Sequence, residues 1–246
     1  MPLPPRRVLR TFKYAMYFDG RGGYVSIPSW LNNLMGKEWT VEVWVNTIVF
    51  VRQVGLANLF SSYSYNYFGW GLLHETSLNR LVFMTFYSGG NNYITLVGWN
   101  AYFGSWRHVV GRYSESLNDQ SLFLDASLKG SVSPKPMVAS PYNPVIGGDI
   151  VVQYISIARV YSKPLSASEI KWNYQYPDNP VRDGLVLWLK ADPQYIRDID
   201  GDGVLEWVDL SGYGNHGKIY GAQLVELVKT PSRVLKPAVR ILKPAR

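Results

Sequence analysis

Short runs of β-branched and aromatic residues alternate with clusters of glycine, asparagine, serine and proline over residues 14–161. In the segment 39–46, Trp39, Val41, Val43 and Val45 fall on one face of a predicted strand, and the residues between them fall on the other. The other expected strands are residues 14–18, 24–27, 57–62, 68–73, 80–87, 92–97, 106–113, 120–124, 143–146 and 151–161. Many short strands at this spacing predict an all-β sandwich of two antiparallel sheets.

A short helix, a linker and one more strand follow the predicted sandwich. Ser166 and Glu169 have the spacing of a capping box, which predicts a helix near residues 166–174. Residues 177–184 include two prolines and none that we expect in a core, so this stretch is predicted to be a linker. The apolar run Leu-Val-Leu-Trp-Leu at 185–189 predicts the next strand.

The composition excludes several kinds of chemistry. The 246 residues include no cysteine, which excludes disulfides, thiolate catalysis and zinc sites of the cysteine type. Aromatic residues make up 15% and charged residues 17% of the chain, a balance that favours an aromatic-rich β fold. We expect no membrane span, because no stretch approaches about 20 apolar residues, and no export by the usual route, because residues 1–7 lack the apolar core of a secretory signal.

Basic residues are concentrated at the two ends of the chain. Residues 1–13 and 229–246 hold ten of the 25 lysines and arginines and no acid, so the body has 15 basic against all 18 acidic residues, a net charge of −3. We therefore expect a mildly acidic body with two basic arms, residues 1–13 and 225–246. The C-terminal arm repeats itself, because Arg233-Val-Leu-Lys-Pro-Ala238 is followed by Arg240-Ile-Leu-Lys-Pro-Ala245.

Two interpretations of the C-terminal arm stay open. It is either a disordered, solubilising tail or an extended segment that lies along an adjacent subunit or an acidic surface, and the regular Val, Leu and Ile between its charges favour the second. Nucleic acid would be such a surface through phosphate neutralisation, although the arms lack interleaved aromatic residues for base stacking. The candidate assembly contacts in the arm are Arg233, Leu235, Lys236, Arg240, Leu242 and Lys243.

Residues 198–209 have the pattern of a calcium-binding loop. Carboxylates stand at loop positions 1, 3, 5, 9 and 12 and a glycine at position 6, and the carbonyl at position 7 would be a further oxygen ligand for Ca²⁺. The candidate ligands are Asp198, Asp200, Asp202, Val204, Glu206 and Asp209. The alternative is a solvated acidic turn without an ion. We expect calcium as a structural cofactor that fixes a long connection, and an ion-stabilised loop in a chain without cysteine would suit a hot habitat.

Five longer motifs resemble those of a known family. They are Ala15-Met-Tyr-Phe-Asp-Gly-Arg-Gly-Gly-Tyr-Val-Ser-Ile-Pro28, Trp39 to Val45, Trp106-Arg-His-Val-Val110, Leu122-Phe-Leu-Asp125 and Ile155-Ser-Ile-Ala-Arg-Val-Tyr-Ser-Lys-Pro-Leu-Ser166. Over residues 14–175 the chain is similar to the laminin G-like jelly rolls of the concanavalin A-like lectin and glucanase superfamily. The resemblance implies a jelly-roll sandwich over residues 14–176, with sugar binding as its usual activity. Ser156 and Ile157 replace the family's acidic pair, so the resemblance does not carry over any ion or ligand that family members hold through those acids.

The order of the segments differs from the family's order. Residues 185–192 and 209–222 resemble the segment that normally comes before the opening motif, and here they come last. Two strands alone are not stable in water, so residues 185–224 must dock on a sandwich through Leu185, Leu187, Trp188 and Leu189. They dock either on their own sandwich, as in a circular permutation, or on that of a neighbouring subunit, as in a strand swap.

Catalysis is not expected. Glycoside hydrolysis needs two carboxylates about 5–9 Å apart, and the Glu-x-Asp-x-x-Glu signature of the family's glucanases does not occur in the chain. Glu42 is the only acid inside a clearly predicted strand, and we expect His108 to be a packed strand residue. The candidate glycan-binding residues are Tyr63, Tyr65, Tyr67, Trp70 and Trp99, each of which could equally belong to the core or to an interface.

Three functional hypotheses follow. The preferred one is a non-enzymatic structural or adhesion protein that self-assembles through its terminal segments into a filament or an array on a particle, in a virion or an extracellular appendage. It would form a homo-oligomer or polymer and could also bind a glycan. The second hypothesis is a monomeric carbohydrate-binding module, and the third is a hydrolase with unrecognised acids.

Overall fold

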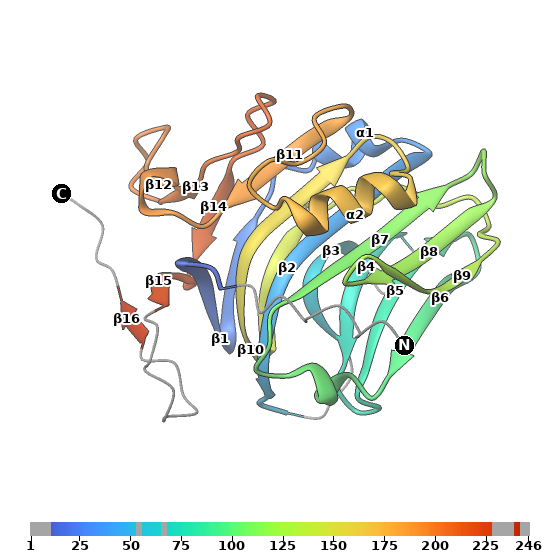
Figure 1. Ribbon diagram of the computed structural model, residues 1–246. Coiled ribbons are helices and arrows are strands. Elements are labelled where there is room, and N and C mark those ends of the chain that lie inside the picture. The colour runs from blue at the N-terminus through green and yellow to red at the C-terminus, as the bar shows by residue number, and fades with distance from the viewer. Residues whose placement is uncertain (1–10, 53–55, 65–67, 228–238, 242–246) are drawn as a thin grey trace, which may run out of the picture.

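The computed structural model describes residues 11–52, 56–64, 68–227 and 239–241 (Figure 1). Its elements are β1 (Tyr14–Ser26), α1 (Leu31–Met35), β2 (Glu38–Phe50), β3 (Leu56–Ser64), β4 (Phe68–Glu75), β5 (Arg80–Tyr87), β6 (Gly90–Val97), a 3₁₀ turn (Trp99–Tyr102), β7 (Arg107–Ser114), β8 (Asp119–Leu124), β9 (Ser127–Val132), β10 (Val145–Tyr161), α2 (Ala167–Gln175), β11 (Leu185–Lys190), a second 3₁₀ turn (Pro193–Tyr195), β12 (Ile196–Arg197), β13 (Glu206–Trp207), β14 (Gly217–Tyr220), β15 (Gln223–Leu227) and β16 (Val239–Ile241).

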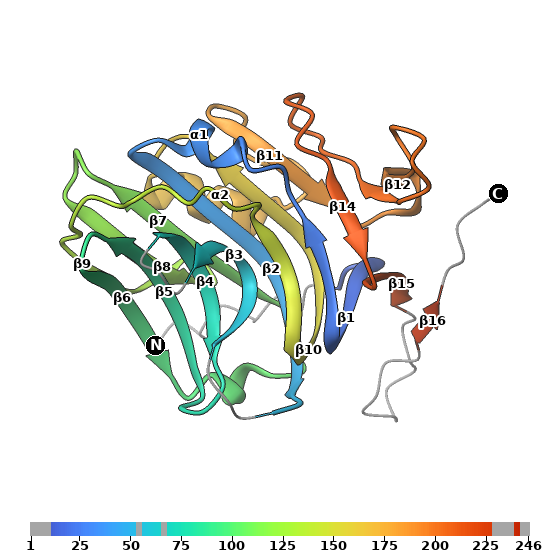
Figure 2. The same cartoon turned by 180° about the vertical axis from the view of Figure 1, so that it is seen from behind.

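The strands form two antiparallel layers, as the sequence predicts. One layer has the order β1-β10-β2-β7-β8-β9, and the other has the order β3-β4-β5-β6 and lies behind it in Figure 1 and in front of it in Figure 2. The start of β10 also pairs with β3, at Val145 with Ser61 and Ile146 with Phe60, and so links the two layers. The predicted jelly-roll sandwich is confirmed.

The alternation in β2 explains how the sheet is covered on both faces. Trp39, Val41, Val43 and Val45 lie between the two layers, in the main hydrophobic core. Trp44, on the other face, belongs to a second cluster beneath α2. The predicted capping box starts this helix, because the Ser166 side chain accepts from the backbone N–H of Glu169 while the Glu169 side chain accepts from the backbone of Ser166.

A buried ionic network lies under α2. Glu42 accepts from Arg159 Nη1 at 2.5 Å, His108 Nε2 lies 3.1 Å from its other oxygen, and Asn173 of α2 donates to it at 3.0 Å. Arg159 also donates to the carbonyl of Pro177, which fixes the stretch between α2 and β11. Burial would raise the pKa of the Glu42 carboxyl, but Arg159 and then His108 outweigh it and lower the pKa to about 2.

The last part of the chain closes the sandwich of the same chain. β10 pairs with β1 from Val145 to Ile155 and with β11 from Ile157 to Tyr161, so β11 occupies the edge of β10 beyond the point where β1 leaves it. The opposite edge of β1 pairs with β14 and β15. The four residues predicted to dock, Leu185, Leu187, Trp188 and Leu189, are all buried. Within this single chain the late segment thus docks on its own sandwich, and the choice between its own and a neighbouring sandwich stays a prediction.

Some elements differ from the predictions. β1 and β10 are each one long strand where two were expected, and β9 and α1 were not predicted. Residues 177–184 are more than a linker, because Pro177 and Pro180 are buried. Within the described residues, neither α-helix is long and apolar enough to cross a membrane.

Candidate functional site

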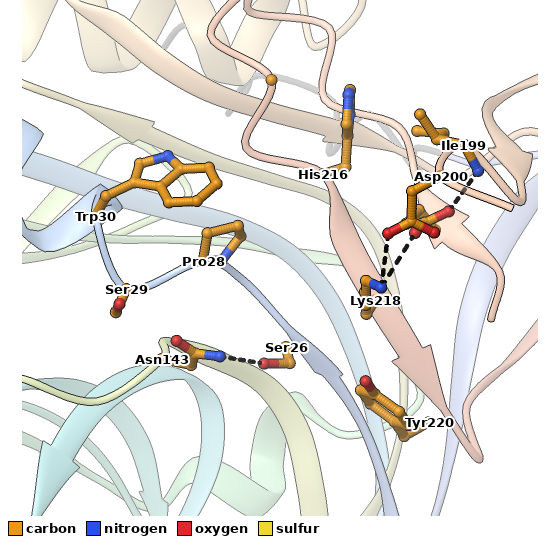
Figure 3. A pocket seen from close by; sticks show the side chains of 12 residues that line it. Ser26, Pro28, Ser29, Trp30, Asn143, Ile199, Asp200, His216, Lys218 and Tyr220 are labelled. Atoms are coloured by element: carbon orange, nitrogen blue, oxygen red, sulfur yellow. Dashed lines mark hydrogen bonds and ion pairs between the residues drawn. The ribbon is translucent and has the colours of Figure 1, made fainter. Parts of the chain in front are cut away.

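A pocket of about 420 Å³ lies where the early and late parts of the chain meet (Figure 3). The end of β1 and the loop after it supply Ser26, Pro28, Ser29 and Trp30, and the loop before β10 supplies Asn143. The late part supplies residues of the β12–β13 loop and of the stretch around β14, among them Asp200, His216, Lys218 and Tyr220. Residues almost 200 positions apart in the sequence therefore form one site.

Two aromatic side chains stand at the pocket with exposed surface. Trp30 is 53% exposed and Tyr220 is 39% exposed. The indole N–H of Trp30 donates to the side-chain oxygen of Asn215, which is buried and in turn donates to the carbonyl of Val186 next to β11's core residues. Tyr220 stacks on Tyr24 of β1, with ring centroids 5.1 Å apart. Both rings are thus held in place by contacts within the chain.

Polar groups line the pocket between these rings. Asn143 Nδ2 donates to Ser26 Oγ at 3.2 Å. His216 Nδ1 accepts from the backbone N–H of Asp209 at 3.0 Å, so a neutral His216 carries its proton on Nε2. Together with Lys218 and Asp200, these groups provide hydrogen-bond donors and acceptors beside two apolar faces.

The side-chain ammonium of Lys218, in β14, lies among the carboxylates of the acidic loop. Its Nζ is 2.8 Å from Asp200 Oδ2 and 3.9 Å from Glu206 Oε1, and it also pairs with Asp202. Hydrogen bonds to Asp200 and Asp202 raise the pKa of Lys218, and the bond from Lys218 is the main reason that the pKa of Asp202 is lowered. The loop and β14 are therefore tied together by charge at the rim of the pocket.

Four of the predicted calcium ligands come together. Asp198, Asp200, Asp202 and Glu206 each offer an oxygen within 4.8 Å of the others. Asp198 accepts from the backbone N–H of Gly201 and of Gly203, and Val204 donates its N–H to Asp202. A set of carboxylate oxygens at this spacing fits the donors that Ca²⁺ prefers.

Asp209 is not part of this group. Its carboxylate accepts from the backbone N–H groups of Trp188, Ser211 and Asn215, which fixes the turn after β13 to β11. The pattern predicts a calcium ligand at loop position 12, but the Asp209 side chain at that position accepts backbone hydrogen bonds instead. Sequence spacing could not reveal this role, because it depends on β11 lying alongside.

The predicted glycan-binding residues need correction. Trp70 and Trp99 are each 1% exposed and belong to the main core, so neither can stack on a sugar from solvent. Tyr63 lies in β3 and nothing is described of its side chain, while Tyr65 and Tyr67 lie outside the described residues. Trp30 and Tyr220 were not predicted from the sequence, because they line a common pocket only once residues 199–220 dock beside β1. Their one sequence signal is an aromatic residue next to turn-forming residues, in Pro28-Ser29-Trp30 and Tyr220-Gly221.

The remaining predicted residues fall into two groups. Glu42 and His108 are completely buried, so neither reaches a substrate, and His108 is the packed strand residue that was expected. In the C-terminal arm, Arg240 lies in β16, where the strand register places it opposite Glu226. Arg233, Leu235, Lys236, Leu242 and Lys243 lie outside the described residues.

Comparison with known proteins identifies relatives of the fold. The family described as the concanavalin A-like lectin/glucanases superfamily matches residues 19–171. No curated protein matches the chain. A solved structure from Bacteroides ovatus, provisionally described as a carbohydrate-binding protein, is 15% identical with a TM-score of 0.66, and the match covers 88% of this chain and 60% of that one. The binding domain of botulinum neurotoxin serotype D/C is 12% identical with a TM-score of 0.50, covering 66% of this chain and 46% of that one. The chain thus spans less than two thirds of either.

Proposed function

The chain belongs to the concanavalin A-like lectin/glucanase superfamily, and on that premise we propose that it is a carbohydrate-binding protein whose site is the pocket between Trp30 and Tyr220. The observation that carries the proposal is the pairing of two exposed, fixed aromatic rings with polar groups in one hollow. Sugar rings offer an apolar face to an aromatic ring and hydroxyls to polar groups. A pocket volume of this size is within the usual range of about 300–1,000 Å³ for small-molecule sites.

The proposed activity is binding without hydrolysis. A glycosidase needs one carboxyl that stays protonated to act as general acid. The carboxylates of Asp200 and Glu206 line the pocket, but both are engaged by the Lys218 ammonium, at 2.8 and 3.9 Å, rather than turned as a free pair toward a ligand. Glu206 is also only 3% exposed. This arrangement supports a binding role better than acid catalysis.

Calcium is proposed as a structural ion of the same region. Asp198, Asp200, Asp202 and Glu206 would hold it, and Lys218 would have to give up its contacts with these carboxylates. A bound ion would then fix the β12–β13 loop, which supplies part of the pocket wall. This role concerns the shape of the site, and the chemistry of binding still rests on the aromatic and polar side chains.

The test begins with a glycan array probed with the whole chain, followed by calorimetric titration of a glycan that binds. Replacing the stacking ring in Trp30→Ala should raise the Kd at least about tenfold, as loss of a central aromatic contact typically does. Trp172→Ala is the matched control, because Trp172 is also half exposed, at 44%, and its indole N–H also donates, here to Asn179, but it lies on α2. Absence of any bound glycan, or equal loss in both variants, would refute the proposal.

A second function, self-assembly into a filament or a surface array, is favoured by one observation. β16 belongs to the basic C-terminal arm and adds as a strand to β15 through the backbone. Strand addition of this kind is a general way for one chain to bind another. The matching test is sedimentation of the whole chain over a range of concentrations, where an assembling protein gains mass and a monomeric module does not.

A further inference from the structure

The sheet has an accepting edge at β15. One edge of β15 pairs with β1, from Tyr14 opposite Glu226 to Tyr17 opposite Gln223. Its other edge pairs with β16, and Figures 1 and 2 show both short strands at the periphery, beyond β1. An unpaired strand edge presents a row of backbone N–H and C=O groups that will pair with any suitable strand. β16 covers these groups in the described structure.

The hold of β16 on this edge is weak. It consists of three residue pairs, Val225 with Ile241, Glu226 with Arg240 and Leu227 with Val239. Within the described residues, β16 pairs with no strand other than β15. Eleven residues, 228–238, separate the two strands, so closing this contact within one chain carries the entropic cost of a loop. The same strand from another copy would make the same backbone bonds without closing that loop.

The sequence repeats the segment that contains β16. The Arg-Ile-Leu-Lys-Pro-Ala repeat that begins at Arg240 includes two residues of β16, and Arg233-Val-Leu-Lys-Pro-Ala238 repeats it seven positions earlier. Only one edge of β15 is free for either repeat, because β1 occupies the other. The acceptor edge of one copy can therefore take either repeat of its own chain or the matching segment of another copy.

We propose that β16 exchanges between copies of this chain, the β16 of one copy pairing with the β15 of the next. This proposal deepens the second function above and rests on it, whereas it is independent of sugar binding. The contact joins unlike surfaces, a donor arm and an acceptor edge, so repeated exchange produces a ring or an open filament rather than only a dimer. The partner is a second copy of the same chain.

Two oppositely charged residues of the β15–β16 pair can be used to distinguish exchange between copies from pairing within one chain. Arg240 stands opposite Glu226, and opposite charges at directly opposed positions of an antiparallel pair are favourable, whereas like charges are not. In a Glu226→Arg chain both positions are positive, and in an Arg240→Glu chain both are negative. Each variant is therefore mismatched with itself and complementary to the other.

The experiment measures mass by light scattering and sedimentation at low salt, over a range of concentrations. The whole unmodified chain should gain mass with concentration. A charge mismatch weakens closure and exchange alike, because both use the same register, so the single variants serve as the reference. An equimolar mixture of the two variants should assemble at about fivefold lower concentration than either alone, because only pairing between unlike copies is matched. The double variant Glu226→Arg with Arg240→Glu should behave as the unmodified chain. Lys13→Ala is a control for the nearby ion pair, since Lys13 Nζ is 4.0 Å from Glu226, and it should leave assembly unchanged.

Each contrary result has a separate meaning. If the unmodified chain stays monomeric at every concentration, then self-assembly itself fails and the exchange fails with it. If the mixture of the two variants stays as dissociated as either alone, then assembly uses another surface and the exchange of β16 is overturned.

Discussion

β11 and β16 are both late strands added to the edge of an existing sheet, but they are held very differently. β11 pairs with β10 over five registered residue pairs and buries Leu185, Leu187 and Leu189. β16 has three backbone pairs with β15 and no other strand partner within the described residues. β11 thus combines five residue pairs with buried side chains, and together these make it part of the fold. β16 pairs through three residues, and the proposed exchange relies on this shorter pairing.

Charged groups also fix the stretch between α2 and β11, residues 176–184. Arg159 binds both Glu42 and the Pro177 carbonyl, Lys190 pairs with Asp178 at 2.8 Å, and Lys163 pairs with Asp183. The late segment therefore has a beginning fixed by ion pairs and an end, β16, that pairs with β15 over three residues, with the pocket-forming loop between them.

The largest effect is expected from breaking the fixed end at Arg159. Arg159→Met leaves the Glu42 carboxylate buried without its main counter-charge, which should lower the free energy of unfolding by about 3–5 kcal/mol. Urea denaturation measures the loss. Arg80→Met is the control, because the Arg80–Glu75 pair spans 3.6 Å at the partly exposed surface and should contribute less than about 1 kcal/mol. Equal losses in the two variants would show that the Glu42 network does not fix this end.

Protonation of His74 in β4 should make the sandwich less stable at acidic pH. Burial lowers the pKa of His74 to about 4, partly opposed by its bond with Gln153 of β10. Between pH 6.5 and 4 the histidine is protonated in the unfolded chain and neutral in the folded chain. The free energy of unfolding therefore falls as pH falls, by about 3 kcal/mol in total.

Glu42 lowers the free energy of unfolding further between pH 4.5 and about 2, because its pKa is lowered in the folded state. Unfolding measured by denaturant at each pH would test this, and His74→Leu should flatten the upper window; an unchanged pH profile in that variant would be contrary.

Calcium should stabilise the loop between the two ends by a smaller amount. At a free concentration 100-fold above its Kd, an ion that binds only the folded chain adds about 2.7 kcal/mol, a shift of several degrees in Tm. The double change Asp200→Asn with Asp202→Asn should abolish the shift, while Asp149→Asn, outside the cluster, should keep it. A melting scan with and without calcium measures both, and no shift in the unmodified chain would favour the ion-free acidic turn.

The smallest effect on stability is expected at β16. Ile241→Pro removes a backbone donor from a strand of three residue pairs and should change the free energy of unfolding by less than about 0.5 kcal/mol. Leu187→Ala in β11 should cost about 2–5 kcal/mol in the same denaturation experiment, because Leu187 is completely buried. Comparable losses from the two substitutions would remove the contrast between the ends.

The sequence predicted the sandwich because its signals are local. The alternation of residues 39–46 and the capping box at Ser166 depend on neighbours in the chain, and both are confirmed. The pocket was not predicted, since Trp30 and Tyr220 meet only through the docking of a late segment. Trp70 and Trp99 were misjudged for the same reason, because exposure depends on which strands cover a residue. The interpretation of residues 185–224 as the family's displaced opening stays a prediction, as the family match ends at residue 171.

The central claim is that residues 185–227 close the sandwich of their own chain and so build the pocket. The chain has no cysteine, so a pair introduced by Tyr17→Cys and Gln223→Cys, directly opposite each other in β1 and β15, would be the only thiols. After mild oxidation, a non-reducing gel should show a monomer with an internal disulfide. Disulfide-linked dimers and higher species at every concentration would contradict the claim, because they would show that the segment docks on a neighbouring copy.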